Sequence, residues 1–291
     1  MAQIIQLFIY GLQLGTVYAL VALGYTMVYG IVRLINYAHG DYLMLGAYAA
    51  FLVGIQGGFV LALIAAMFAA GVIAVATDQT AYKPMREEPK LSTLVVAIGV
   101  SMFIQHLSRA IPFMGPFPRV FPAFIKSIPL NIGGVAFNST QIILIVLAVA
   151  LMLGLNFVVS KTKAGRSMRA VSMDRDAAVL MGVDINRTIA ITFFIGGLVA
   201  GAGGVFYSIM YPTLEVSIGS FLGGKAFIAA VVGGIGNLKG AMFGGIVMGI
   251  AEIYATSLNA DVGFGVTYLI LIIILLIKPA GLFGKFVPEK V

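Results

Sequence analysis

IIQLFIYGLQLGTVYALVALGYTMVY (residues 4–29) is an apolar stretch near the amino terminus that contains no charged residue. A helix needs about 20 apolar residues to cross a hydrocarbon core about 30 Å thick, so this stretch is long enough to span a membrane. It lacks a preceding basic segment, and it is too long for the apolar core of a cleavable signal peptide. The stretch therefore predicts an uncleaved first membrane-spanning helix.

Similar stretches recur along the chain, which is 60% hydrophobic and only 10% charged. Soluble domains carry about 25% charged residues. The apolar runs are continuous rather than alternating, which favours helices over a β-barrel. The further predicted spans are 37–52, 59–80, 92–108, 141–159, 189–207, 221–232, 241–258 and 264–277. The sequence therefore predicts an all-α polytopic membrane protein, a single domain over residues 1–291, with eight or nine crossings and some short or broken helices.

Lysine and arginine gather in a few segments between these spans. Cytoplasmic loops of membrane proteins carry an excess of both residues, so the distribution predicts topology. The basic residues assigned to the cytoplasmic side are Lys83, Arg86, Lys90, Lys161, Lys163, Arg166, Arg169, Arg175, Arg187, Lys278, Lys285 and Lys290. The proline-rich stretch 111–129 cannot form a regular helix and is assigned to the outside. With nine crossings, the amino terminus lies outside and the carboxyl terminus inside.

Two stretches share their spacing of aromatic, glycine and alanine residues. They are YGIVRLINYAHGDYLMLGAYAA (29–50) and YSIMYPTLEVSIGSFLGGKAFIAA (207–230), and their alignment pairs Gly40 with Gly219. In the predicted topology the two copies cross in opposite directions, as inverted repeats of transporters do. A chance similarity is the alternative.

Residues for catalysis or nucleotide binding are scarce. The chain has no cysteine, and its two histidines are His39 and His106, so no metal-binding pattern is present. A phosphate-binding loop ends in Lys-Ser or Lys-Thr after a glycine-rich run, and GGKA at 223–226 lacks the first glycine and the hydroxyl. The net charge of +7 comes from loops and is explained by topology rather than by nucleic acid. We expect a non-catalytic chain without a cofactor or metal of its own.

The longest predicted cytoplasmic loop, 161–187, contains the pattern DAAVLMG (176–182). Acidic residues favour the positive N-terminal end of a short helix, and a glycine favours a left-handed stop at its other end. The small apolar face between them fits a groove on a partner protein, and nearby arginines can contact carboxylates there. A solvated loop helix without a partner is the alternative. The residues assigned to this docking site are Arg169, Asp174, Arg175, Asp176, Ala177, Ala178, Met181 and Gly182, with Leu180 and Arg187 beside them.

Longer stretches resemble one family of transport proteins. GRSMRAVSMDRDAAVLMGVDINRT (165–188) is similar to the coupling loop of permeases in branched-chain amino acid ABC importers, with Asp176 where glutamate is usual. GLQLGTVYALVALGYTMVYGIVRLINYAHGDYLMLGAY (11–48), KAFIAAVVGGIGNLKGAMFGGIVMG (225–249) and KPAGLFG (278–284) point to the same family. The first of these three resembles the LivH-type member of the permease pair. The resemblance extends over nearly the whole chain, and the proline-rich loop is its least similar part.

The resemblance implies a multi-subunit importer in a bacterial inner membrane. It implies a second, related permease, two cytoplasmic ATPase subunits that bind ATP and Mg²⁺, and a periplasmic or lipid-anchored binding protein that delivers branched-chain amino acids. Other amino acids, amides and urea are alternative substrates. A self-contained secondary transporter or channel for small polar solutes is the alternative function, and an intramembrane enzyme or scaffold is a third.

Ionisable groups at membrane depth are costly and usually belong to a pathway or an internal pair. Arg33, Asn36, His39 and Asp41 stand where the first span gives way to the second. Residues 29–52 contain no proline and no loop-like run, so we expect a break inside the bundle, satisfied by these side chains, rather than an ordinary interfacial turn. Arg33 and Asp41 are candidates for a pair.

Two further ionisable residues, Lys225 and Glu252, lie in neighbouring predicted spans. A lone carboxylate in the middle of a span is neutral, paired or hydrated, and a structural pair between these two residues is the favoured interpretation. Nearly every face of the spans is apolar, so the sequence does not predict which side chains line a pathway.

Overall fold

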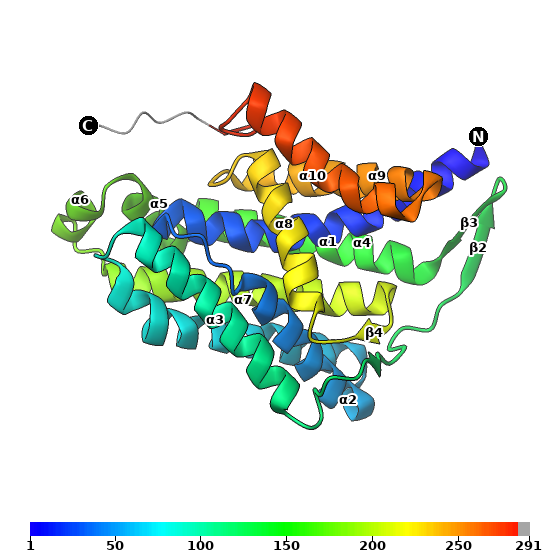
Figure 1. The fold of residues 1–291 in the computed structure, drawn as a ribbon, viewed down its shortest axis with the longest axis horizontal. Helices are drawn as coiled ribbons and strands as arrows, with labels where there is room; N and C mark the ends of the chain where they lie inside the picture. Colours follow the sequence, from blue (N-terminus) through cyan, green and yellow to red (C-terminus); the bar gives the residue numbers. More distant parts are fainter. Residues whose placement is uncertain (285–291) are drawn as a thin grey trace.

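The computed structural model describes residues 1–284, which form an α-helical bundle (Figure 1). Seven of the described helices are long and apolar enough to cross a membrane, and α8 is a shorter apolar helix. The apolar helices are α1 (Ala2–Val32), α2 (His39–Thr77), α3 (Lys90–Ala110), α4 (Ser139–Lys161), α7 (Ile185–Met210), α8 (Ile218–Gly233), α9 (Leu238–Leu258) and α10 (Ala260–Ile277). The all-α polytopic prediction is confirmed.

Helix α2 is a hairpin rather than one straight rod. Gly58 interrupts it with φ 70° and ψ −174°. A Cβ at Gly46 would lie 3.0 Å from the carbonyl oxygen of Ala66, whereas a straight helix would separate these residues by about 30 Å. The two arms are the second and third predicted spans. With the arms counted separately, each of the nine predicted stretches is helical in the described part of the chain.

The helical structure is interrupted between α1 and α2. Residues 33–38 are not helical, and Arg33 ends α1 with φ 57°, the one positive φ among the described non-glycine residues. The chain then turns back into the protein, because Gly40 in the first turn of α2 packs against Gly219 and Gly223 of α8. Figure 1 shows α2 starting within the bundle rather than at its edge. The break inside the bundle is as expected from the sequence.

Helix packing in the second half of the chain repeats that in the first half. If Gly40 corresponds to Gly219, then α1 corresponds to α7, the first arm of α2 to α8, and the second arm to α9. Helix α1 packs along α9, and α7 packs in the equivalent manner along the second arm of α2. Gly40 and Gly219 themselves are in contact, as equivalent residues near a two-fold axis would be.

Small residues make both of these helix contacts close. A Cβ at Gly11 would lie 2.7 Å from Cα of Ile250 in α9. In the equivalent contact, a Cβ at Gly197 would lie 2.7 Å from Cα of Gly71. Backbones approach this closely in membrane proteins where glycine and alanine line both faces.

The segments assigned to the cytoplasm lie together at one end of the bundle (Figure 1). They include η1 (Asp78–Tyr82), η2 (Lys83–Met85), α5 (Lys163–Met173) and α6 (Arg175–Leu180). Lys285 and Lys290 lie outside the described residues. The cytoplasmic identity of this end stays a prediction.

The amino terminus and two small antiparallel sheets lie at the opposite end (Figure 1). Strand β1 (Arg119–Val120) pairs with β4 (Thr213–Leu214), and β2 (Pro129–Ile132) pairs with β3 (Val135–Asn138). The sequence interpretation did not include these strands, which are two to four residues long and too short to display an alternating pattern.

Candidate functional site

The predicted docking helix is present as α6, at the end of the bundle assigned to the cytoplasm. Asp174 is its N-cap, and the Asp174 carboxylate accepts a hydrogen bond of 3.0 Å from the backbone N–H of Ala177. Asp176 lies in the first turn. Gly182 follows with φ 78°, and its N–H donates to the carbonyl of Val179 at 2.9 Å. The acidic start and the left-handed glycine stop are both as expected.

The apolar surface of α6 differs from the expected one. Leu180 and Met181 are 87% and 83% exposed, and Met173 just before the helix is 85% exposed. Ala178 is only 3% exposed, so its assignment to the docking face is wrong. Its backbone carbonyl accepts a hydrogen bond from Val183, which folds the chain over that side of the short helix. We define the exposed tip as Met173, Val179, Leu180 and Met181.

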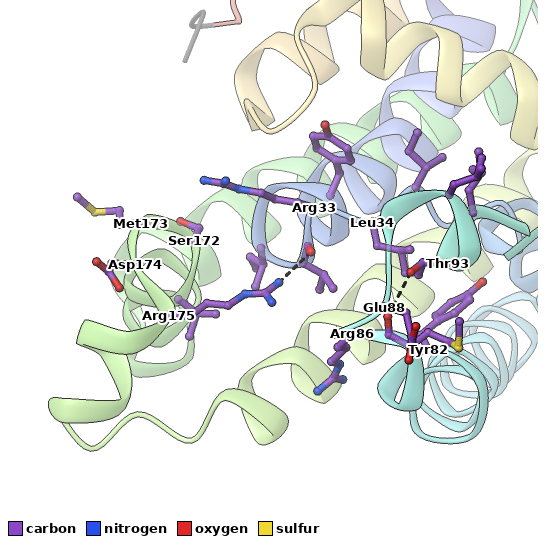
Figure 2. Close-up of a pocket in the computed structure, with 18 residues that line it drawn as sticks. Arg33, Leu34, Tyr82, Arg86, Glu88, Thr93, Ser172, Met173, Asp174 and Arg175 are labelled. Atoms are coloured by element: carbon purple, nitrogen blue, oxygen red, sulfur yellow. Dashed lines mark hydrogen bonds between the residues drawn. The ribbon is translucent and has the colours of Figure 1, made fainter. Parts of the chain in front are cut away.

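Arg175 turns toward the bundle rather than outward. Its guanidinium donates a hydrogen bond of 2.9 Å to the carbonyl oxygen of Val32, the last residue of α1 (Figure 2). Burial lowers the pKa of this guanidinium, and the nearby positive charges of Arg86 and Arg33 lower it further. Arg175 therefore ties α6 to the end of α1, whereas Arg169 and Arg187 remain exposed.

Helix α5 was missed by the sequence interpretation. Thr162 caps it, because its hydroxyl accepts a hydrogen bond from the N–H of Gly165 at 3.1 Å. Gly165, Met168 and Val171 form its buried side. Their spacing of three residues is the helical signal that predicts this amphipathic element.

A cavity of about 870 Å³ lies between these elements (Figure 2). One wall is the end of α1 with the start of the break, a second runs from Tyr82 to Leu94, and α5 and α6 supply the third. Arg86 is held at its edge by a salt bridge of 2.7 Å to Asp78 and a hydrogen bond of 2.6 Å to Asn186 in the first turn of α7. The cavity therefore adjoins both the docking helix and the break.

The inner end of the cavity meets the polar residues of the break. Tyr82 lines the cavity, and its hydroxyl donates to the side-chain oxygen of Asn36 at 2.8 Å. Asn36, His39 and Asp41 are only 1–2% exposed. Arg33 remains exposed, so the suggested pair between Arg33 and Asp41 is wrong. Arg33 keeps its charge at the bundle end, while Asp41 enters the interior with α2.

Several buried polar atoms at the break lack a hydrogen-bond partner among the described residues. They are Nδ2 of Asn36, Nε2 of His39 and both carboxylate oxygens of Asp41. Asp41 faces Ser101 and Gln105 of α3. Buried polar groups are nearly always hydrogen-bonded, so water or neighbours such as Ser101 and Gln105 are expected to satisfy these atoms, and the assignment of this region to a transport pathway stays a prediction.

Lys225 and Glu252 form the expected ion pair, 2.5 Å apart. Tyr18 and Thr267 also donate hydrogen bonds to the Glu252 carboxylate, at 2.9 and 3.3 Å. The Lys225 ammonium lies 4.4 Å from the ring centre of Phe221 and 4.8 Å from that of Phe264. The aromatic and hydroxyl partners were not predicted.

Within the described residues, no group of acidic, histidine or cysteine side chains is arranged to hold a metal ion. The site instead combines a capped surface helix, a cavity behind it and a broken helix with buried polar groups. Together with the seven described helices that are long and apolar enough to cross a membrane, this arrangement is that of a multi-pass α-helical membrane protein, the class to which transport permeases belong.

Known proteins identify the family. The family described as "Branched-chain amino acid transport system / permease component" matches residues 7–276. The chain is 36% identical over 310 residues to the high-affinity branched-chain amino acid transport system permease protein BraD of Pseudomonas aeruginosa, covering 99% of this chain and 98% of that protein. It is 35% identical over 301 residues to LivH of Escherichia coli, covering 97% and 96%. The chain belongs to this permease family.

A more distant relative comes from an archaeon. The probable branched-chain amino acid transport permease protein LivH of Methanocaldococcus jannaschii is 28% identical over 284 residues, which cover 91% of this chain and 88% of that protein. The similarity thus spans the bundle rather than one motif.

Proposed function

We propose that this chain is the membrane-spanning permease subunit of an ABC importer for branched-chain amino acids. Nearly full-length relatives are named as permease proteins of such systems. In this proposal residues 1–291 form one permease domain in the bacterial inner membrane. The chain pairs with a second related permease, receives substrate from a periplasmic or lipid-anchored binding protein, and is driven by two cytoplasmic ATPase subunits that bind ATP and Mg²⁺.

The observation that carries the ATP-driven part of the proposal is the exposed tip of α6. The tip gathers four exposed apolar side chains, Met173, Val179, Leu180 and Met181, on one short segment, and a contiguous exposed apolar patch is typical of a protein contact. The tip lies beyond the ends of the spans, in the most basic part of the chain (Figure 1). A short helix entering a groove of an ATPase subunit would cover Leu180 and Met181.

Arg175 supports a route from that contact to the transport pathway. Its hydrogen bond to Val32 joins the start of α6 to the last carbonyl of α1 (Figure 2). The next residue, Arg33, begins the break that leads to Asn36 and Asp41. In the proposed mechanism, movement of α6 by the ATPase subunits shifts the end of α1 and the polar turn behind it.

Charged substitutions at the tip test this coupling. Leu180→Asp and Met181→Asp should leave the protein inserted in the membrane, because neither side chain is packed against the bundle. Co-purification of the ATPase subunits and substrate-stimulated ATP hydrolysis should both be lost. Leu258→Asp, which alters an 84% exposed leucine at the end of α9, is the matched control and should retain both. Full uptake by the two tip variants would overturn the coupling role.

The substrate class is tested separately. The purified complex with its binding protein should import Leu, Ile or Val in an ATP-dependent manner. Flux of these solutes through the chain alone in liposomes, driven by an ion gradient, would replace the proposal with a self-contained transporter. A binding protein without affinity for aliphatic amino acids would overturn the substrate while leaving the ATP-driven class intact.

A further inference from the structure

A second cavity lies at the end of the bundle opposite α6. Its volume is about 440 Å³, and we call it the outer chamber. Gln13 of α1, Thr140 of α4, Ser208 of α7 and Ile253 of α9 line it, and residues 121–127 form another wall. Binding cavities for small molecules are typically about 300–1,000 Å³, so the chamber has the size of a site for one small solute.

The lining of the outer chamber is polar but carries no formal charge. Its side chains are amides, hydroxyls and apolar groups, and no Asp, Glu, Lys, Arg or His residue lines it. Such a lining cannot hold a phosphate or a divalent cation strongly, because these ions need compensating charges. It suits a solute with hydrogen-bonding ends and an aliphatic body, since amides and hydroxyls interact with both carboxylate and ammonium groups without a deep electrostatic trap.

Two hydroxyl groups of the chamber lack hydrogen-bond partners among the described residues. They are Oγ of Ser208, whose residue has 0% exposure, and Oγ1 of Thr140. Gln13 beside them is 5% exposed. A buried hydroxyl without a partner costs free energy unless a ligand or water satisfies it. These unpaired groups therefore point to an occupant.

The wall formed by residues 121–127 is fastened to the end of α7. The N–H of Phe121, which follows β1, donates to the carbonyl of Pro212, which precedes β4, at 3.1 Å and so extends the pairing of these strands. Phe121 is only 3% exposed and packs edge to face against Phe124, with ring centres 5.2 Å apart. The proline-rich loop thus forms one wall of the chamber and is held in place by the end of α7.

We propose that the outer chamber is the first site at which the permease binds its substrate, a small zwitterionic amino acid with an aliphatic side chain. Gln13, Thr140 and Ser208 donate to and accept from its charged ends, and Phe121 and Ile253 contact its side chain. The inference deepens the proposed function and rests on it for the identity of the solute. It predicts that the proline-rich loop, through Phe121, contributes to substrate selection.

Cysteine protection tests the chamber directly, because the native chain contains no cysteine. Thr140→Cys, at a half-buried position of the lining, would be introduced into the complete importer and treated with a small, membrane-impermeant cationic methanethiosulfonate. Leucine delivered by its binding protein should slow modification of the cysteine on the order of tenfold when the leucine concentration is about ten times the Kd of the chamber. The modification rate is proportional to the fraction of chambers without leucine. Asn131→Cys, on the exposed β2 strand, is the matched control and should react equally with and without leucine.

A second variant keeps the test informative if Thr140→Cys does not assemble. Ile253→Trp narrows the chamber and should reduce the maximal uptake of leucine more than that of the smaller valine. If Thr140→Cys reacts at the same rate with and without leucine in an importer that still carries leucine, the chamber is not a substrate site. An unchanged ratio of leucine uptake to valine uptake for Ile253→Trp would also overturn the chamber. If the importer instead carries a different neutral solute, and this solute protects the introduced cysteine from modification, the chamber is a substrate site but the proposed amino acid substrate is wrong.

Discussion

The ion pair between Lys225 and Glu252 allows a quantitative test of whether buried polar groups stabilise the bundle or take part in transport. Lys225 is 2% exposed and Glu252 is 8% exposed, so replacing Glu252 by Gln leaves a buried ammonium without its counter-charge. Removing one partner of a buried ion pair costs about 3–5 kcal/mol, because the remaining charge is uncompensated. The same substitution also weakens the hydrogen bonds from Tyr18 and Thr267, each worth about 0.6 kcal/mol in a membrane protein.

Replacing both partners should have a different outcome. In Lys225→Met/Glu252→Met no buried charge remains, and the methionine side chain retains the contact with the two phenylalanine rings. Such apolar replacements of buried pairs are often neutral or stabilising by about 1–4 kcal/mol. We therefore expect the double variant to be more stable than either single variant.

Thermal unfolding of the purified protein in detergent measures the effect. A loss of about 3–5 kcal/mol corresponds to a fall in melting temperature of roughly 6–20 °C, at about 2–4 °C per kcal/mol, as found for chains of about 150–250 residues. Uptake by the double variant then separates two roles. Restored stability with normal uptake identifies a structural pair, and restored stability without uptake places the pair in the pathway. A Glu252→Gln variant as stable as the native protein would refute the reasoning.

Other outcomes follow from the glycine positions and the topology. Gly182 has a φ of 78°, which is unfavourable for a branched residue, so Gly182→Val should destabilise the end of α6 by about 1–2 kcal/mol and uncouple ATP hydrolysis from uptake. Gly182→Asn should retain coupling. Substrate-stimulated ATPase activity measures the effect in both variants. Gly11→Val should lower the melting temperature through about 1–3 kcal/mol of overpacking against α9, while Gly265→Val, which faces open space on α10, should not. Asp176→Cys should react with impermeant reagents only from the cytoplasm and Asn131→Cys only from outside, and reversed labelling would contradict the topology.

The membrane spans were predictable because each is a long run of apolar residues in the sequence. Gly58 interrupts such a run, so the α2 hairpin appears in the sequence as two separate stretches. The ion pair between Lys225 and Glu252 was predictable for a different reason, since both charges are too costly to leave alone in lipid. Neutral partners such as Tyr18 and Thr267 carry no comparable signal among many hydroxyls.

Other features depend on the orientation of short segments, which the pattern of residues leaves open. α6 has only six residues, so its alanines could face inward or outward, and Ala178 faces inward. The Arg33–Asp41 pairing failed because the left-handed turn at Arg33 leaves its side chain at the end of the bundle, where a guanidinium stays hydrated. The outer chamber was not predicted because its lining comes from α1, α4, α7, α9 and the proline-rich loop, which are far apart in the sequence and meet only in the folded chain.

The contact between Gly40 and Gly219 has a consequence for how the bundle could move. Helix α1 lies on α9 as α7 lies on the second arm of α2, and α1 and α7 run in opposite directions (Figure 1), so the two halves of the chain contain equivalent helix pairs of opposite orientation. If the halves exchanged conformations, the helix pairs would remain the same while the open end of the protein changed sides. Two states of opposite access would then have similar packing energies, and binding of a partner or solute that favours one state would be enough to select it.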